Sequence, residues 1–161
     1  ATAPSMINID NWVDVIIFNQ ILQNWDYYEN NMNLMFWGTK WSLGVTDLDW
    51  TVGLWAGYGG GDAINLLSWR GTLFPNKIYP ALLSRIKIRY TELRNNKIID
   101  INNLYEIYSE IPSLIGENRY KKEVEHWTSF PNSGQNRFNT EKIMTVLTAR
   151  IGYLDSIWKL P

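Results

Sequence analysis

The chain has 161 residues and a mass of 18.8 kDa, a size that fits one compact domain or one lobe of a larger one. Its 15 basic and 16 acidic residues leave a net charge of −1, which excludes a general electrostatic case for nucleic-acid binding, since such binding needs a concentrated basic face. The absence of cysteine excludes disulfides, zinc–thiolate sites and thiol nucleophiles. No apolar run is long enough to span a membrane, so we expect no membrane span.

The first predicted element is a helix over residues 8–24, which carries a broad apolar stripe with a few polar interruptions. Asn8 or Asp10 is suited to cap its first turn. The width of the stripe favours a helix that is buried on two sides. A polar turn is predicted over residues 26–31, directly after this helix.

Two short strands are predicted next, over residues 32–37 and 41–46. Gly38 and Thr39 lie between them and favour a hairpin. Residues 47–62 hold five glycines interspersed with aromatic residues, a pattern typical of a loop with high backbone freedom.

The second half of the chain is predicted to be helical, because apolar residues recur at three- and four-residue steps. The sequence as a whole therefore predicts a mainly helical α+β fold in a single domain, residues 1–161. The expected helices lie over residues 76–95 with Pro80 in the first turn, from Asp100 onward, over residues 119–127 after a kink or break at Pro112 and Gly116, and from Asn139 or Thr140 onward after a loop over residues 128–138.

Three carboxylates and one amide are predicted to converge at one end of the hairpin. Asp26 follows the first helix, and Asn31 lies five residues further on. A hairpin returns the end of its second strand to the start of its first, which brings Asp47 and Asp49 toward them. If the extended backbone continues past Thr46, both aspartates lie on the same face of the strand. Carboxylate and amide oxygens are the ligands preferred by hard cations such as Mg²⁺.

The order of these residues is also the order found in phosphoryl-transfer sites. There one aspartate accepts the proton of the substrate hydroxyl, and an asparagine and a later aspartate hold the metal ions. Asp26 is therefore the candidate catalytic residue, and Asn31 with Asp47 or Asp49 are the candidate metal ligands. The alternative remains open that Asp26 and Asn31 form a helix cap or an Asx turn, as such residues often do after a helix.

The chain resembles the C-terminal half of the CotH-type spore coat kinases, a family of atypical protein kinases. The similarity runs in order along nearly the whole sequence, with Thr46 at a position where the family usually has tryptophan. It is carried by residues 13–20 and 24–26, Asn31, residues 40–43 and 47–53, Arg85, residues 92–94 and residues 150–156.

This resemblance implies the catalytic lobe of an ATP-dependent enzyme that uses Mg²⁺ or Mn²⁺ to phosphorylate Ser or Thr hydroxyls of a protein substrate. The N-terminal lobe that holds the nucleotide in the family is missing from residues 1–161, and Ala1 opens the chain without a basic, apolar leader. We therefore expect an excised or processed C-terminal lobe, inactive alone and completed by an N-terminal lobe or a partner chain. The family further implies a bacterial protein of the spore coat or cell surface.

The other function that the sequence allows is a non-catalytic module, either a degenerate kinase lobe that acts as a scaffold or an aromatic-rich binder of glycans or peptides. Trp50, Trp55, Tyr58 and Trp69 lie in or near the glycine-rich loop and are the candidate stacking residues. Packing in the core is instead expected for Trp12, Trp127 and Trp158.

Charged residues elsewhere receive simpler expectations. His126 is the single histidine and is expected at the surface or in a cap, and Lys121 with Lys122 on a solvated helix face. Arg85, Arg89 and Arg94 lie on one predicted helix and are expected to meet either acidic groups of a substrate or, in buried or bridging ion pairs, the carboxylates of the hairpin.

Overall fold

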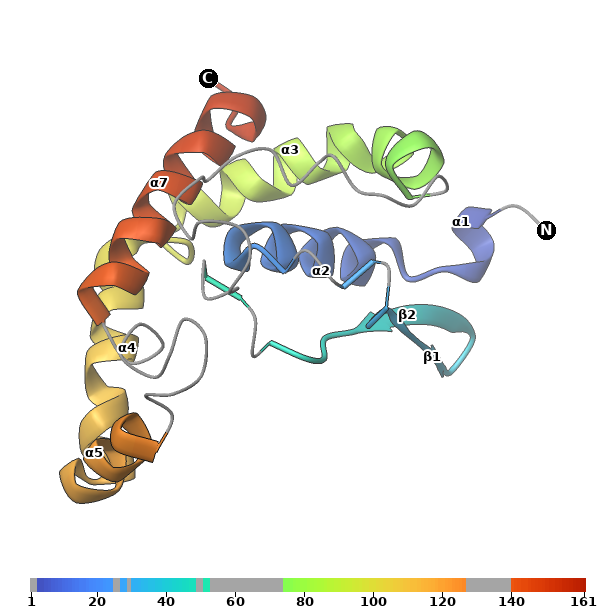
Figure 1. The fold of residues 1–161 in the computed structure, drawn as a ribbon. Helices are drawn as coiled ribbons and strands as arrows, with labels where there is room; N and C mark the ends of the chain where they lie inside the picture. Colours follow the sequence, from blue (N-terminus) through green and yellow to red (C-terminus); the bar gives the residue numbers. More distant parts are fainter. Residues whose placement is uncertain (1–2, 25–26, 29, 49–50, 53–73, 127–139) are drawn as a thin grey trace.

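The computed structural model describes residues 3–24, 27–28, 30–48, 51–52, 74–126 and 140–161. These residues form a mainly helical α+β fold with a two-stranded antiparallel sheet, as predicted (Figure 1). In chain order the elements are α1 (Ala3–Met6), α2 (Ile9–Leu22), β1 (Asn33–Trp37), β2 (Lys40–Gly44), the π-helix η1 (Phe74–Ile78), α3 (Tyr79–Asn95), α4 (Ile101–Ile115), α5 (Glu117–His126) and α7 (Thr140–Trp158). None of the described helices combines the length and the apolar character needed to cross a bilayer.

Helix α2 lies at the centre of the fold. The side chain of Asn8 caps its start by accepting a hydrogen bond from the backbone N–H of Asn11. The helix ends at Gln23, whose left-handed backbone has a φ of 57°. Helices α3 and α7 and strand β2 all pack against α2, so most of its side chains are buried. The predicted helix over residues 8–24 with burial on two sides is confirmed.

The hydrophobic core lies between three helices that come from distant parts of the sequence. Figure 1 shows α3 along one side of α2, α7 crossing at the end of both, and the hairpin on the opposite side of α2. Trp12 and Trp158 are both buried in this core, as expected, whereas Trp127 lies outside the described residues. The largest apolar side chains with no more than 2% exposure are Ile16, Ile17, Tyr27, Leu43, Ile86, Tyr90, Leu147, Leu154 and Trp158.

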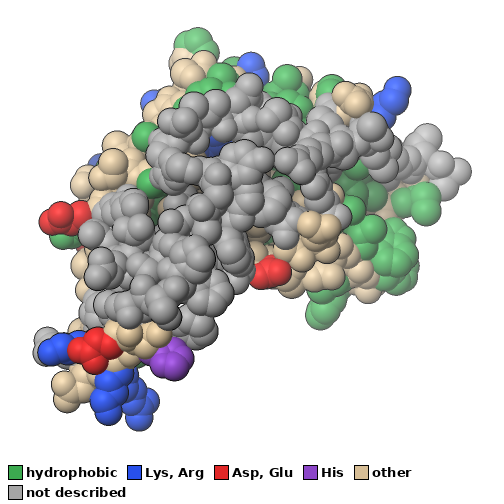
Figure 2. Space-filling view, in the orientation of Figure 1, with side chains coloured by type: hydrophobic (Ala, Val, Ile, Leu, Met, Phe, Trp, Pro, Cys, Tyr) green, Lys and Arg blue, Asp and Glu red, His purple; other side chains and the backbone are tan. Residues whose placement is uncertain are grey.

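Strands β1 and β2 pair with Asn33 opposite Gly44 and Trp37 opposite Lys40. The turn between them uses Gly38, whose φ of +66° is readily available to glycine. All five residues of β1 are exposed, and Figure 2 shows hydrophobic side chains gathered on the surface over the hairpin. The hairpin is therefore confirmed, and its outer strand presents apolar side chains to solvent.

The hairpin is attached to α2 through its inner strand. The Asn11 side chain accepts a hydrogen bond from the Leu43 N–H at 2.7 Å and donates one to the Leu43 carbonyl at 3.2 Å. The indole N–H of Trp12 donates to the Trp41 carbonyl at 3.1 Å. Because Asn11 and Trp12 both lie in the first turn of α2 and bond to backbone groups of β2, that helix fixes the position of β2.

The predicted extension of the second strand is wrong. Strand β2 ends at Gly44, two residues before the predicted end at Thr46, and Asp47 has a left-handed backbone with a φ of 56°. The period-two alternation expected to continue through Asp47 is therefore broken before it reaches this residue. Aspartate tolerates this conformation better than most residues because its side chain can bond to nearby backbone.

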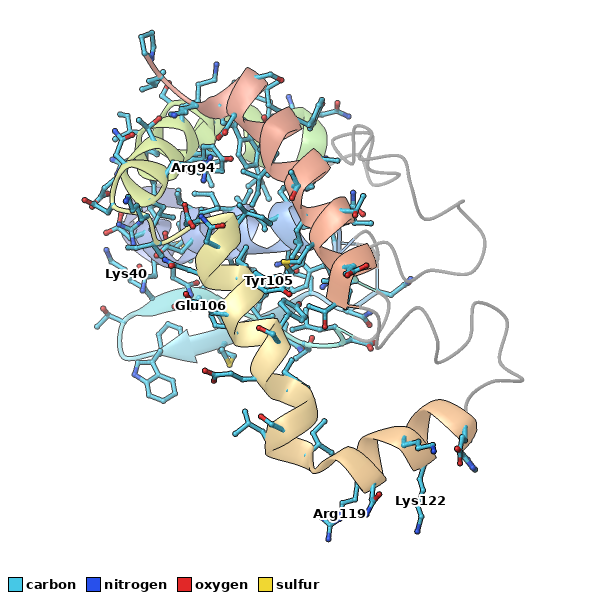
Figure 3. The ribbon with its side chains drawn as sticks, turned by 90° about the vertical axis from the view of Figure 1, so that its left-hand side faces the viewer. Lys40, Arg94, Tyr105, Glu106, Arg119 and Lys122 are labelled. Atoms are coloured by element: carbon cyan, nitrogen blue, oxygen red, sulfur yellow. The ribbon has the colours of Figure 1, made fainter. Side chains whose placement is uncertain are left out.

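The helices of the second half begin and end close to their predicted positions. Pro80 lies in the first turn of α3, and the Asp100 carboxylate caps α4 by accepting backbone N–H bonds of 2.9 and 3.3 Å. Helix α4 continues past Pro112, and the break comes at Gly116, whose φ is +89°. Figure 3 shows the far end of α4 and all of α5 extending away from the core.

Two arginines of α3, Arg89 and Arg94, form ion pairs with other helices, which corrects the expectation that they pair with the carboxylates near the hairpin. Arg89 pairs with Asp14 on α2 at 2.8 Å, and Arg85 is exposed on the same helix α3. Arg94 pairs with Asp155 on α7 at 2.9 Å, and the Tyr90 hydroxyl donates to the same carboxylate at 2.8 Å. Burial raises the pKa of Asp155, but the hydrogen bonds from Arg94 and Tyr90 outweigh it and lower that pKa below its ordinary value.

Candidate functional site

Two of the four predicted site residues, Asn31 and Asp47, lie in the part of the chain that the structure describes. Asn31 lies two residues before β1, and Asp47 lies three residues after β2 with its side chain exposed. Asp26 and Asp49 lie outside the described residues. The site is therefore built here from Asn31, Asp47 and the described neighbours of all four residues.

The segment that contains Asn31 is hydrogen-bonded to the segment that precedes Asp47. The Thr46 hydroxyl donates to the Asn31 carbonyl at 2.9 Å and accepts a hydrogen bond from the Asn33 side chain at 3.0 Å. The Asn31 N–H donates to the Tyr27 carbonyl at 3.2 Å. Asn31 is thus held beside the residue that immediately precedes Asp47, at the open end of the hairpin.

Tyr27 forms a second connection between the same two segments. Its side chain has 0% exposure, and its hydroxyl donates to the Gly44 carbonyl at 2.7 Å. Tyr27 directly follows Asp26 in the sequence, and Gly44 is the last residue of β2. The residue next to Asp26 is therefore fixed to the strand that leads to Asp47.

A third connection links the end of α2 to the residues that follow Asp49. The Val52 N–H donates to the Leu22 carbonyl at 2.6 Å. Thr51 is buried, and its hydroxyl donates to the Leu48 carbonyl at 2.7 Å, which holds Leu48 and Thr51 together. The residues on either side of this pair, Asp47 and Val52, are both left-handed, with a φ of 56°. Such a φ costs energy at a β-branched valine, and costs of this kind tend to occur at functional sites.

The end of α2, four residues before Asp26, is held by buried polar side chains. The Asn24 side chain donates to the Asn19 carboxamide oxygen at 2.8 Å, and the Asn24 N–H donates to the Asn19 carbonyl at 2.9 Å. Arg150, from α7, is fully buried and donates to both the carbonyl and the side-chain oxygen of Gln20, each at 2.6 Å. The direction in which the chain leaves α2 is therefore fixed by a buried hydrogen-bond network.

The tyrosines beside the site lie in a poorly solvated environment. Burial raises the pKa of Tyr27 to about 12. Burial and the neighbouring Tyr27 together raise the pKa of Tyr28 well above its ordinary value. The site therefore combines an exposed carboxylate, Asp47, with a buried wall on the α2 side.

Tyr27→Phe is expected to lower the free energy of unfolding at neutral pH by about 1 kcal/mol, because the bond to the Gly44 carbonyl is lost. The raised pKa of Tyr27 means that the folded state keeps this proton while the unfolded state loses it between pH 10 and about 12. Wild-type stability therefore falls across that range. The decrease is expected to be shallower in Tyr27→Phe, as measured by urea unfolding at several pH values.

Tyr105→Phe provides the matched control, because Tyr105 is half exposed on α4 (Figure 3). It is expected to leave the neutral-pH stability unchanged, because its hydroxyl is not enclosed in the core. An alkaline slope in Tyr27→Phe equal to that of the wild type would contradict the assignment of Tyr27 as a buried, neutral phenol.

The donors near the site have the right chemistry for a hard divalent cation, because Asn31 and Asp47 bear only oxygen ligands. Within the described ranges no group of three or more histidine, cysteine, aspartate or glutamate side chains is placed to hold a metal ion. Of the three predicted carboxylates only Asp47 belongs to those ranges. The predicted metal set therefore stays a prediction.

Three residues that organise the site were not recognised as such from the sequence: Tyr27, Thr46 and Arg150. For Arg150 a signal was present, because it follows Leu147 by three residues and precedes Leu154 by four. A charged residue on the apolar stripe of a helix indicates a buried partner. Tyr27 and Thr46 carry no comparable signal, since their hydrogen bonds depend on how the hairpin folds back.

The remaining candidates from the sequence divide between surface residues and undescribed ones. His126 is exposed at the end of α5, and Lys121 and Lys122 are exposed on the same helix, as expected. Figure 2 shows these basic and histidine side chains at the far end of the molecule. The candidate stacking residues Trp50, Trp55, Tyr58 and Trp69 lie outside the described residues.

Comparison with known proteins identifies one family. The family model described as CotH kinase protein matches residues 1–154, nearly the whole chain. No significant similarity was found to any curated protein or to any solved structure. The family match agrees with the resemblance found in the sequence and with its mainly helical fold.

Proposed function

Because the chain belongs to the CotH kinase family, we propose that it is the catalytic lobe of an atypical protein kinase that transfers phosphate from ATP to Ser or Thr hydroxyls. The family supports a kinase-like protein that uses ATP and a divalent metal in general. The assignment of individual residues to these roles is our proposal. Asp26 is the catalytic residue, and Asn31, Asp47 and Asp49 hold the metal.

Asp26 accepts the proton of the substrate hydroxyl while the hydroxyl oxygen attacks the γ-phosphorus of ATP. The bond between the γ-phosphorus and the oxygen that leaves with ADP breaks in the same step. A bound Mg²⁺ or Mn²⁺ neutralises the negative charge of the phosphates. Asn31 and one or both of Asp47 and Asp49 supply its oxygen ligands. Catalysis of this kind depends on positioning and charge neutralisation, so a carboxylate with an ordinary pKa is sufficient for Asp26.

One observation carries this proposal: three hydrogen bonds join the chain around Asp26 and Asn31 to the chain around Asp47 and Asp49. They link Leu22 to Val52, Tyr27 to Gly44 and Asn31 to Thr46. In the sequence Asp26 directly precedes Tyr27, and Asp49 lies three residues before Val52. This arrangement supports a common site for the four oxygen-bearing side chains.

We further propose that the lobe acts together with an N-terminal lobe, or a partner chain, that clamps the phosphates of ATP, and that it is inactive alone. The apolar and exposed β1 strand, with Trp37 80% exposed, is consistent with a chain that has a neighbour in the active enzyme. The family name points to the spore coat in general, and we propose a location in the spore coat or at the cell surface. A protein is the proposed phosphate acceptor.

The test is the thermal stability of the full-length protein with Mn²⁺ and ATP. A ligand that binds only the folded state at a hundred times its dissociation constant stabilises it by about 2.7 kcal/mol. The wild type is expected to show a clear rise in melting temperature. Asp47→Asn is expected to lose most of that rise, because it removes a charged ligand. Glu106→Gln removes the same charge on α4, which lies on the opposite side of the molecule from the hairpin (Figure 1), and is expected to keep the rise.

Two outcomes would contradict the proposal in different ways. A rise that is equal in the wild type and in Asp47→Asn would remove Asp47 from the metal site. A wild type that shows no rise with Mn²⁺ and ATP would indicate a degenerate lobe that acts as a scaffold.

A further inference from the structure

Arg150 is a charged residue in the middle of the hydrophobic core. It lies on α7 with 0% exposure, between the buried residues Leu147 and Leu154. Its burial lowers the pKa of the guanidinium to about 10, a sign that the surroundings disfavour the charge. A well-packed apolar side chain at such a position is often as stabilising as a buried charge or more so. Stability alone therefore does not account for an arginine here.

The hydrogen bonds of Arg150 reach the last turn of α2. Its Nε donates to the Gln20 carbonyl and its Nη2 to the Gln20 side-chain oxygen, each at 2.6 Å. Its guanidinium also lies 5.2 Å from the centre of the Tyr153 ring, on the next turn of α7. Carbonyls in the last turn of a helix have no partner within the helix, and a cation is favoured there by the helix dipole. Arg150 thus joins α7 to the end of α2 that precedes the candidate catalytic residue Asp26.

The residues that follow this contact set the course of the chain toward position 26. Gln23 adopts a left-handed conformation, and its N–H bonds back to the last turn of α2. Asn24, only 4% exposed, is fixed to Asn19 by two hydrogen bonds of 2.8 and 2.9 Å. Gln20 is the sequence neighbour of Asn19. A change in the position of Gln20 therefore moves Asn19, and with it the two hydrogen bonds that hold Asn24.

We propose that Arg150 is a positioning residue, which holds the end of α2 and Asn24 in the arrangement that phosphate transfer at the neighbouring candidate site needs. This inference rests on the proposed function and deepens it. Arg150 acts through Gln20 and Asn24 and needs no contact with substrate or metal. It connects the site to α7, 130 residues away along the chain.

The test compares Arg150→Met and Arg150→Lys in the full-length protein. Methionine fills a similar volume without the hydrogen bonds, and lysine keeps the charge but cannot bind both oxygens of Gln20 in the same fork. For Arg150→Met we expect kcat to fall about tenfold or more with little change in the KM for ATP, because misplacement of catalytic groups acts on the chemical step. Arg150→Lys is expected to recover part of the loss.

A second measurement is independent of activity. Amide hydrogen exchange at Asn24 and Asn31, whose N–H groups bond to Asn19 and Tyr27, is expected to become about tenfold faster in Arg150→Met while α3 keeps its protection. Arg94→Met is the control, because it breaks the ion pair with Asp155, five residues further along α7, and leaves the bonds between Arg150 and Gln20 in place. It is expected to lower the melting temperature without changing kcat or the exchange of Asn24 and Asn31.

The outcomes separate this inference from the proposed function. Unchanged exchange at Asn24 and Asn31 in both Arg150 variants would overturn the positioning role, as would an equal increase across α2 and α3. A different result is also informative: exchange at these two amides is faster in Arg150→Met, but the wild type transfers no phosphate. This result would uphold the structural link and refute the catalytic function.

Discussion

Replacing Asp26 with alanine is expected to lower metal-dependent phosphate transfer from ATP by about a hundredfold or more, because the substrate hydroxyl loses its proton acceptor. The measurement is the transfer of labelled phosphate by the full-length protein in the presence of Mg²⁺ or Mn²⁺. Asp49→Asn is expected to reduce transfer as well, through weaker metal binding, and excess metal is expected to restore part of this second loss.

Asp14→Ala is the control for the Asp26 substitution. Asp14 lies on the same helix that leads to Asp26, but it is exposed and pairs with Arg89 on α3. An exposed ion pair contributes little to stability, so this variant is expected to transfer phosphate like the wild type. Full activity of both Asp26→Ala and Asp49→Asn would contradict the assignment of the site, even if the fold is correct.

Trp158→Ala is expected to cost about 3 to 5 kcal/mol in the free energy of unfolding, the range found when a large buried aromatic side chain is removed. Trp158 is 1% exposed at the end of α7. Its indole N–H donates to the Tyr79 hydroxyl at 2.9 Å, and its ring meets that of Tyr90 edge to face at 5.6 Å. Its removal leaves a cavity and takes away the hydrogen-bond donor of a half-buried hydroxyl.

Trp37→Ala makes the same chemical change on the surface of the hairpin, where Trp37 is 80% exposed. Its expected cost is within about 0.5 kcal/mol, as for most surface substitutions. The two variants are compared by urea unfolding, with the same dependence of the unfolding free energy on urea concentration used for both. A similar cost for both would show that the α2–α3–α7 core is not the main source of stability.

The elements of this fold could be predicted from local patterns to a large extent. The stripe of Ile16, Ile17 and Ile21 predicted α2, and Pro80 marked the start of α3. Gly38 marked the hairpin turn because a left-handed φ is accessible to glycine at little cost. These signals are local, since each depends on the side chains and backbone preferences of neighbouring residues.

The end of β2 shows where local reasoning fails. Val45 and Thr46 continue the apolar–polar alternation of the strand, and the prediction carried the same extended backbone on to Asp47. In the structure Thr46 bonds to Asn31, and Asp47 turns to a left-handed conformation. The backbone thus leaves the sheet to meet a segment fifteen residues earlier in the chain, and no pattern within the strand encodes that meeting.

Residue type and spacing were enough to indicate the family, the helical periodicity and the order of the four oxygen-bearing residues, because these properties belong to the chain before it folds. The packing of the folded chain was needed to show that Tyr27, Thr46 and Val52 join the segments near the candidate site, and that Arg150 reaches Gln20. A buried hydrogen bond must find its partner wherever packing places it. For residues up to 130 positions apart, that place is set by how whole helices pack, and not by local preference.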